Sequence, residues 1–318
     1  MNGLENMEQL RYKFAWIFLV LLFLIFTLLC CARGPARTGP RPSQFPVADA
    51  TVPAEEYVDL NIVLMESTFK LQGITSGDSL LFGTAFVFDL PCKEDPRKAV
   101  LVTSHHLLDS LQNDRALLGL RDKRWDGSWE ERPWWIDIRR HGKPLWIRHK
   151  DADVAALCVS LPRYVDIPLS SLDLLADEGT FQKYEIHPGD ALMCLGYSSQ
   201  NGVHGKGGFP ILRGGVIASY PLFPVEKHKT FRFDMEIFKG YSGGPVFFSQ
   251  LGRLYGGASH PEEQIQFIAG LLSKQWFADK EEKQPLKVAE VVHALFIREV
   301  VEKLLTREIE ENAIEEAL

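Results

Sequence analysis

The sequence predicts an all-β domain that carries a helical segment at each end. From about Tyr57 to Phe277 the chain consists of short runs of β-branched and aromatic residues, separated by Gly, Pro and Asp turns. Such runs are typical of strands. They do not alternate with helical segments, so the pattern favours an antiparallel barrel or sandwich over βαβ units. The two ends differ from this middle part, because one contains a charge-free apolar segment and the other has a helical period.

Length and charge limit the classes of function. The chain has 318 residues, enough for one large domain or for two barrels that share a cleft. Hydrophobic residues make up 46% of the chain, an ordinary value for a globular protein. The formal net charge is −7, and an acidic chain has no electrostatic basis for binding nucleic acid. We therefore expect no nucleic-acid partner.

An apolar segment follows the N-terminal tail of residues 1–13. Phe14–Ala32 contains no charged residue and would form a helix about 28 Å long, which matches the hydrocarbon thickness of a bilayer. We predict a single-pass transmembrane anchor at residues 14–32. A cleaved signal peptide is the alternative, although the segment is longer than the apolar region of most signal peptides and lacks a small-residue cleavage site. A lipoprotein signal at Cys30 or Cys31 would also need a small residue before the cysteine, where the chain has leucine or cysteine.

The charges on either side of this anchor do not fix its orientation. Arg11 and Lys13 precede it, and Arg33, Arg37 and Arg41 follow it. The positive-inside rule therefore favours neither direction. We expect the folded domain outside the cytoplasm, in the periplasm or at the cell surface, because an N-terminal anchor most often delivers the rest of its chain there.

Three further segments complete the domain organisation. Residues 33–54 are rich in Pro, Ala and Arg and are predicted to form an extended linker. The β domain is expected at residues 55–277, with residues 122–146 as a surface insertion between strands. Residues 278–318 are predicted to form an amphipathic helix that packs on the domain or mediates oligomerisation. Its apolar positions are Val288, Val291, Val292, Leu295, Val301, Leu304 and Leu305.

The cysteines and histidines do not indicate a metal site. Three cysteines follow the predicted anchor, and they cannot all pair, so we expect buried free thiols. They are Cys92, Cys158 and Cys194. No Cys–His spacing is typical of a zinc site. A site formed by His105, His106 and Asp109 would lack a fourth ligand, and we predict no metal and no cofactor.

The stretch Gly240–Pro245, with the sequence GYSGGP, holds a candidate nucleophile. A serine between glycines can project its hydroxyl from a tight turn, and glycines let backbone N–H groups converge as an oxyanion hole requires. The same pattern fits the nucleophile elbow of α/β-hydrolases. An elbow serine opens a helix, whereas Pro245–Phe248 is β-branched and aromatic and predicts a strand. Ser242 is therefore predicted to be a nucleophile in a turn that precedes a β-strand, not in an α/β-hydrolase elbow.

Two upstream stretches supply the groups that would activate this serine. The apolar strand Ala99–Thr103 leads to a pair of histidines, where an imidazole could face a cleft as general base. Asp153 begins a second apolar strand with the sequence DVAAL. A buried aspartate can fix the tautomer of an imidazole and stabilise its charged form. The order along the chain is histidine, aspartate, serine.

These three stretches resemble the motifs of trypsin-like serine proteases. VTSHHLL is similar to the T-x-A-H-V motif of that family, DVAAL to its D-[IL]-A-[LV]-[LI] motif, and GYSGGPVF to its G-[DN]-S-G-G-P-[LV] motif. The matching region covers roughly residues 57 to 277. The resemblance implies two antiparallel six-stranded β-barrels of the chymotrypsin type, with the active site between them.

The resemblance also implies a role for each residue of the three motifs. The family's histidine falls at His106, and His105 takes the place of a small alanine. Asp153 would orient His106, and Ser242 would be the nucleophile. The backbone N–H groups of Gly240 and Ser242 would form the oxyanion hole.

Three more residues are candidates for the substrate pocket. Ser259 falls where the family keeps a serine that supports the aspartate, and His260 follows it. Glu236 lies six residues before Ser242, where the family often places the floor of its primary specificity pocket. A carboxylate there would favour Lys or Arg in the substrate. A surface glutamate is the alternative for this position.

One departure from the family pattern narrows the resemblance. Tyr241 replaces the aspartate that receives a newly cut N-terminus in trypsin-type zymogens, and no activation sequence is evident. The motifs are therefore nearest to those of bacterial high-temperature-requirement and glutamyl-type proteases. Too few residues follow the expected barrels for a PDZ domain, and we expect none.

The sequence as a whole predicts a membrane-anchored serine endopeptidase that cleaves peptides or proteins through an acyl-enzyme. A catalytically inactive binding module on the same fold is one alternative. An esterase is another.

Overall fold

The structure is a computed structural model that describes residues 59–89, 98–198, 206–236, 238–277 and 285–316. These residues fall in one compact unit, Tyr57–Leu318. The predicted tail, the transmembrane anchor at residues 14–32, the linker at residues 33–54 and Cys92 lie outside the described residues. Within the described part of the chain, no helix combines the length and the apolar character needed to cross a membrane.

The N-terminal half forms an antiparallel sheet of seven strands in the order β5-β4-β1-β2-β3-β9-β8. Its strands are β1 (Thr68–Ile74), β2 (Leu80–Asp89), β3 (Lys98–Thr103), β4 (Arg115–Lys123), β5 (Trp129–Asp137), β8 (Ile147–Arg148) and β9 (Ala155–Ser160). Among the described residues the edge strands β5 and β8 do not pair with each other, and β8 has only two residues. This half is therefore an open sheet rather than the predicted six-stranded barrel.

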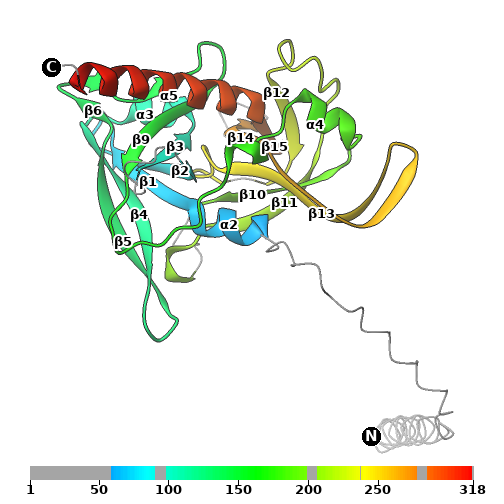
Figure 1. Cartoon of the computed structure of the whole chain (residues 1–318), viewed down its shortest axis with the longest axis horizontal. Helices are drawn as coiled ribbons and strands as arrows, with labels where there is room; N and C mark the ends of the chain where they lie inside the picture. Colours follow the sequence, from blue (N-terminus) through cyan, green and yellow to red (C-terminus); the bar gives the residue numbers. More distant parts are fainter. Residues whose placement is uncertain (1–58, 90–97, 199–205, 237, 278–284, 317–318) are drawn as a thin grey trace, which may run out of the picture. The chain divides into compact units, whose positions relative to one another are not determined.

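The C-terminal half is a closed six-stranded barrel in the order β10-β11-β12-β15-β14-β13. Its strands are β10 (Ala191–Gly196), β11 (Ile211–Ile217), β12 (Thr230–Asp234), β13 (Pro245–Tyr255), β14 (Ala258–Phe277) and β15 (Pro285–His293). One of the two predicted barrels is thus present. Strands β13 and β14 form a long hairpin whose far end extends well beyond the rest of the barrel (Figure 1).

Short helical and strand segments connect these sheets, and one long helix ends the chain. They are α2 (Leu60–Ser67), α3 (His105–Ser110), α4 (Glu178–Lys183), the 3₁₀ turns Leu172–Leu174 and Lys206–Gly208, the two-stranded ladder of β6 (Arg139–Arg140) with β7 (Lys143–Pro144), and helix α5 (Ala294–Glu316).

The prediction of a helix over residues 278–318 was wrong for the first part of that segment. Strand β15 pairs with both β12 and β14 and closes the barrel, so the β domain extends beyond residue 277. Val291 lies in the barrel core, whereas the next residue, Val292, lies in the core beneath α5. A strand buried on both faces loses the alternation that would distinguish it from a helix in the sequence. The helix begins at Ala294.

Strand β2 separates two hydrophobic cores. Phe86 and Phe88 belong to the core that also contains the apolar face of α5, whereas Ala85 and Val87 belong to the core enclosed by the N-terminal sheet. Successive strand residues point to opposite faces, so β2 is buried on both sides. Helix α5 therefore packs on the same core as β2 and lies against β8, β9 and β14 (Figure 1).

The tryptophan-rich residues 122–146, predicted to be a surface insertion, are largely sheet. Strand β5 pairs with β4 over its whole length, and Trp134 lies opposite Leu118 in this ladder. Its neighbour Trp135 is half exposed and lies beneath the guanidinium of Arg115. The segment is thus part of the scaffold of the N-terminal half.

Candidate active site

His106 lies in the short helix α3, directly after strand β3. Leu107 and Leu108 of the same helix are buried in the core of the N-terminal sheet, and they fix α3 in place. The side chain of His106 is 48% exposed. The two histidines predicted at the end of a strand therefore begin a helix, and Ser104 at its N-cap separates them from the strand.

Asp153 makes two hydrogen bonds with His106. Its Oδ2 lies 2.6 Å from His106 Nδ1, and its Oδ1 accepts a hydrogen bond of 2.9 Å from the His106 backbone N–H. An ionised carboxylate can only accept, so the imidazole proton lies on Nδ1. Nε2 is then unprotonated, and this is the tautomer that a general base requires.

Ser273 completes the surroundings of the aspartate. Its hydroxyl donates a hydrogen bond of 2.6 Å to Asp153 Oδ2, and the serine is 2% exposed. Burial of the Asp153 carboxyl acts to raise its pKa, but the hydrogen bonds from His106 and Ser273 outweigh burial. The pKa of Asp153 therefore lies below its ordinary value, and the carboxylate is ionised at neutral pH.

The neighbouring His105 has different surroundings. Its Nδ1 is buried and has no hydrogen-bond partner among the described residues. Burial lowers the pKa of His105, although the charge of Asp109 acts in the opposite direction. Of the two adjacent histidines, His106 is the one that is hydrogen-bonded to Asp153.

Hydrogen bonds on both sides hold the turn that contains Ser242. Its carbonyl accepts a bond of 2.9 Å from the backbone N–H of Thr84 in β2. The next N–H, that of Gly243, donates a bond of 2.7 Å to the carbonyl of Leu272. Leu272 directly precedes Ser273, so the serine turn lies beside the strand segment that contacts Asp153.

Gly243 brings the same turn close to the helix that carries His106. Its φ is +89°, and an added Cβ would lie 2.0 Å from the Thr84 carbonyl oxygen and 3.1 Å from the backbone nitrogen of Ser104. Ser104 is the residue before α3. Only glycine allows this close approach. The fold therefore brings the three motif residues His106, Asp153 and Ser242 to one region between the two halves.

Two backbone donors in the serine turn have no acceptor within the described residues, and they are the N–H groups of Gly240 and Ser242. Gly240 has a φ of +105°, and its carbonyl accepts a hydrogen bond of 2.7 Å from Thr84 Oγ1. The ring of Tyr241 is buried against Gly196 in the barrel, where burial raises the pKa of Tyr241 to about 12. The turn is thus anchored by Tyr241, and its two N–H groups are available to a ligand.

The role predicted for Ser259 was wrong, because Ser273 is the serine that supports Asp153. Ser259 is exposed and pairs with Leu254 near the turn of the β13–β14 hairpin. His260 stacks on Tyr255 in the same part of the hairpin, with ring centroids 4.0 Å apart. Ser273 could not be recognised in the sequence, because the long hairpin increases the number of residues between Ser242 and the part of β14 that reaches Asp153. The feature of the sequence that could have identified Ser273 is the apolar run of β14 that ends at this buried serine.

The substrate-pocket role of Glu236 stays a prediction. Its side chain is 46% exposed, and a carboxylate oxygen lies 4.0 Å from the Arg213 guanidinium. The guanidinium also lies over the ring of Phe238, at 5.1 Å from its centroid. A charge partner of its own would weaken any attraction of Glu236 for a basic substrate.

The described residues hold no group of three or more His, Cys, Asp or Glu side chains that could bind a metal ion. Cys158 and Cys194 are free thiols. Burial raises the pKa of Cys158 to about 12 and also raises that of Cys194. Thiols with such a pKa are poor nucleophiles, so neither competes with Ser242 for that role.

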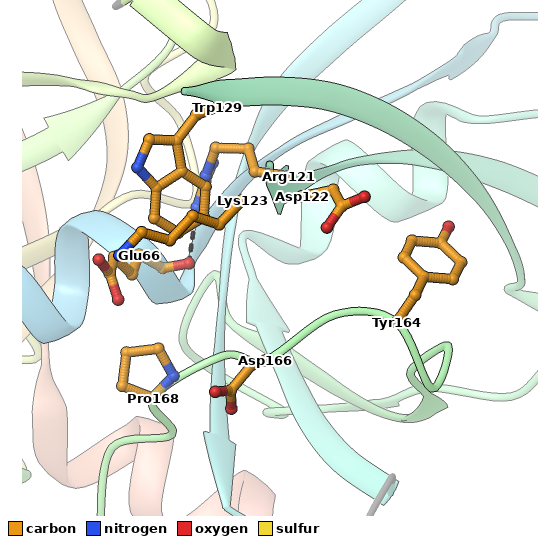
Figure 2. Close-up of a pocket in the computed structure, with 8 residues that line it drawn as sticks. All are labelled: Glu66, Arg121, Asp122, Lys123, Trp129, Tyr164, Asp166 and Pro168. Carbon is orange, nitrogen blue, oxygen red and sulfur yellow. Dashed lines mark hydrogen bonds between the residues drawn. The ribbon is translucent and has the colours of Figure 1, made fainter. Parts of the chain in front are cut away.

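A pocket of about 380 Å³ lies at the ends of α2 and β4 (Figure 2). It is lined by Glu66, Arg121, Asp122, Lys123, Trp129, Tyr164, Asp166 and Pro168. The guanidinium of Arg121 donates to the backbone carbonyl of Glu66 at 2.6 Å. Because no catalytic candidate lines this pocket, it is separate from the site at Ser242.

Comparisons with known proteins give matches to solved structures alone. No model of a protein family matches the chain, and no curated protein matches its sequence. One similar structure is the HtrA-type protease AlgW with tripeptide, with a TM-score of 0.47 and 13% identity, covering 78% of this chain and 62% of that chain. Another is the protease Anisep from Arthrobacter nicotinovorans, with a TM-score of 0.47 and 12% identity. The match covers 77% of this chain and 97% of that chain. This chain thus spans less than two thirds of AlgW.

Proposed function

We propose that the protein is a serine endopeptidase that cleaves peptide bonds through an acyl-enzyme on Ser242. The observation that carries the proposal is the pair of hydrogen bonds, 2.6 and 2.9 Å long, between His106 and Asp153. These bonds leave His106 Nε2 unprotonated in the region where the fold brings the serine turn. The substrate class, a peptide or protein, follows from the resemblance of the three motifs to trypsin-like proteases.

The proposed reaction uses each group in turn. Ser242 Oγ attacks the scissile carbonyl carbon while His106 Nε2 takes its proton. The C–N bond then breaks, and His106 gives the proton to the leaving amine. A water molecule attacks the acyl ester with His106 again as base, and the acid product leaves as Ser242 regains its proton. Asp153 stays ionised and stabilises the imidazolium.

The oxyanion would be stabilised by the N–H groups of Gly240 and Ser242. Both donors lack an acceptor within the described residues, and both belong to a turn held by Thr84. Preorganised donors of this kind contribute about 10²- to 10³-fold each to kcat in acyl transfer. The proposed site needs no cofactor.

Labelling of the full-length protein with a fluorophosphonate tests the proposal, because only an activated serine reacts at a useful rate. We expect labelling of the unmutated protein, none with Ser242→Ala, and a fall of about 10³-fold or more with His106→Ala. His105→Ala is the matched control and should leave the labelling rate within about threefold. Equal labelling of the Ser242→Ala variant would overturn the assignment.

The two alternative functions give different results in the same assay. A non-catalytic binding module would not be labelled at all. An esterase would be labelled and would turn over an ester while leaving a peptide library intact. Peptide cleavage that disappears with Ser242→Ala distinguishes the proposed endopeptidase from both.

We further propose that residues 14–32 anchor the enzyme in a membrane, with the protease domain outside the cytoplasm. The support is the charge-free apolar segment itself, which is long enough to span the hydrocarbon layer. Resistance of the full-length protein to carbonate extraction tests the anchor. Digestion by an external protease in intact cells tests the orientation.

A further inference from the structure

The buried His149 ties together the loop that carries Asp153. The histidine is 4% exposed. Its Nδ1 accepts hydrogen bonds from two backbone N–H groups, that of Asp151 at 3.1 Å and that of Ala152 at 2.9 Å. Its own backbone N–H donates a bond of 3.0 Å to the carbonyl of Val154. One residue therefore holds the loop on both sides of Asp153.

These contacts determine the tautomer of His149. A backbone N–H can only donate, so Nδ1 must be unprotonated and the ring proton must lie on Nε2. Nε2 lies 3.0 Å from Oε2 of Glu299 in helix α5, which can accept that proton's hydrogen bond. The imidazole also packs against the ring of Phe296, with centroids 5.0 Å apart. The C-terminal helix thus contacts His149 through both a carboxylate and an aromatic ring.

Apolar packing joins the same helix to the same loop. Ala152 and Val154, the two neighbours of Asp153, are buried in one core with Ile297 and Val300 of α5. The side chain between them points the other way, because Asp153 hydrogen-bonds to His106. The loop is therefore clamped between α5 on one side and the imidazole of His106 on the other.

We propose that His149 is a positioning residue for Asp153, and that Glu299 of α5 holds His149 in the tautomer that can do this. The inference rests on the proposed serine-protease function, because its effect on catalysis is exerted through Asp153 and His106. It assigns to α5 a part in the active site although the helix touches none of the three motif residues in the observed hydrogen bonds.

A matched pair of variants separates the two hydrogen-bonding sides of the imidazole. In His149→Asn the amide oxygen can occupy the place of Nδ1 and accept the N–H groups of Asp151 and Ala152. In His149→Gln the amide nitrogen can occupy the place of Nε2 and donate to Glu299, but a methylene group replaces the acceptor Nδ1. Both variants remove the aromatic ring, so their effects on packing and thermal stability should be similar.

The full-length protein and both variants would be compared by the rate of fluorophosphonate labelling and by amide hydrogen exchange of residues 151 and 152. We expect His149→Asn to label within about threefold of the unmutated rate. His149→Gln should label about 10- to 100-fold more slowly, because a displacement near 1 Å of a catalytic group has an effect of this size. Exchange at the two amides should be faster in His149→Gln than in His149→Asn.

Equal labelling rates in the two variants would overturn the proposal, whether both are fast or both are slow, because a purely structural histidine would not distinguish them. Unchanged amide exchange in His149→Gln would also overturn it. If the unmutated protein is not labelled, the proposed protease function fails. The exchange comparison then still decides whether His149 holds the loop.

A second matched pair tests the helix. Glu299→Gln keeps an oxygen that can accept from Nε2, and we expect labelling within about threefold of the unmutated rate. Glu299→Leu removes the acceptor and lets the ring proton move to Nδ1, which would expel both backbone N–H groups. Labelling of Glu299→Leu should therefore be about tenfold slower than that of Glu299→Gln. Equal rates would exclude a role for α5 in fixing the tautomer.

Discussion

Thr84 Oγ1 donates a hydrogen bond of 2.7 Å to the carbonyl of Gly240, while the backbone N–H of Thr84 donates one of 2.9 Å to the carbonyl of Ser242. The same hydroxyl accepts a bond of 3.1 Å from the N–H of Tyr197 in the barrel half. One threonine of the N-terminal sheet thus fixes two carbonyls of the serine turn. The orientation of the turn's N–H groups depends on these bonds.

The hydroxyl of Thr84 is therefore expected to contribute to catalysis without contacting substrate. Thr84→Val has nearly the same shape but can neither donate to Gly240 nor accept from the Tyr197 N–H, and these buried groups left unpaired would together cost about 1–3 kcal/mol or more. We expect the fluorophosphonate labelling rate to fall about 10-fold or more and the melting temperature to fall by about 2–12 °C. Thr84→Ser keeps the hydroxyl and should label at a rate close to that of the unmutated protein. Similar rates for the valine and serine variants would contradict this role.

Acid pH should lower the free energy of unfolding through protonation of Asp153. The hydrogen bond from Ser273 should determine the pH range over which this occurs. The folded-state pKa of Asp153 is lowered, so the ionised carboxylate contributes stability that is complete above the unfolded pKa of aspartate. That contribution is lost as the pH falls through the lower, folded-state pKa. Ser273→Ala removes one hydrogen bond to the carboxylate and should move the loss to higher pH.

Urea unfolding of the unmutated protein and of Ser273→Ala, at steps between about pH 2 and pH 6, measures this dependence. Ser249→Ala is a suitable control, because Ser249 lies in the β13–β14 hairpin and contacts Asn61 and Gln264 rather than Asp153. A Ser273→Ala curve that parallels the control at all pH values would contradict the coupling.

Gly243 should tolerate no side chain. An added Cβ would lie 2.0 Å from the Thr84 carbonyl oxygen and 2.2 Å from Thr103 Oγ1, at a φ of +89°. We expect Gly243→Ala to destabilise the protein by about 3 kcal/mol or more and to abolish labelling. Gly257→Ala has a φ of +73° but nothing within 4 Å, so it should cost about 1–2 kcal/mol and label normally. Melting curves and labelling of both variants measure the difference.

Arg121 should stabilise the fold far more than a surface arginine. Its guanidinium is buried and donates to Tyr197 Oη at 2.8 Å and to the Met65 and Glu66 carbonyls, at the end of α2, at 3.2 and 2.6 Å. Burial lowers the pKa of Arg121, but these acceptors and the helix dipole favour the charged form. Arg121→Met leaves the acceptors unpaired and should destabilise the fold by about 3 kcal/mol.

In a protein of this size, that loss corresponds to a fall in melting temperature of about 6–12 °C. Arg124→Met is the matched control, because Arg124 pairs with Glu130 at an exposed position. Exposed pairs contribute about 0–1 kcal/mol. Equal shifts in the two variants would contradict the role given to Arg121.

The three motifs could be placed from the sequence because each depends on local requirements. Gly240 and Gly243 have positive φ values that glycine adopts without strain, and the motif preserves them. The alignment that favours His106 over His105 likewise agrees with the hydrogen bond to Asp153. The β-rich character of the domain was predictable from residue types that favour strands.

Other features depend on which distant segments meet. Ser259 fits a local pattern for the serine that supports Asp153, but the length of the β13–β14 hairpin brings Ser273 there instead. The apolar residues of β15 fit a helix as well as a strand, and pairing with β12 and β14 decided between them.

Residue type, neighbours and order along the chain were enough to predict the chemistry of the candidate site, because they identify a nucleophile, a base and a carboxylate. The contacts that hold this site in place emerged only from the folded arrangement. Thr84, His149 and Ser273 have no distinctive sequence context, and each has one partner far away along the chain, respectively Gly240, Glu299 and Asp153. The physical reason is that hydrogen bonds and packing between distant segments depend on strand pairing and on the position of α5, and local propensity specifies neither.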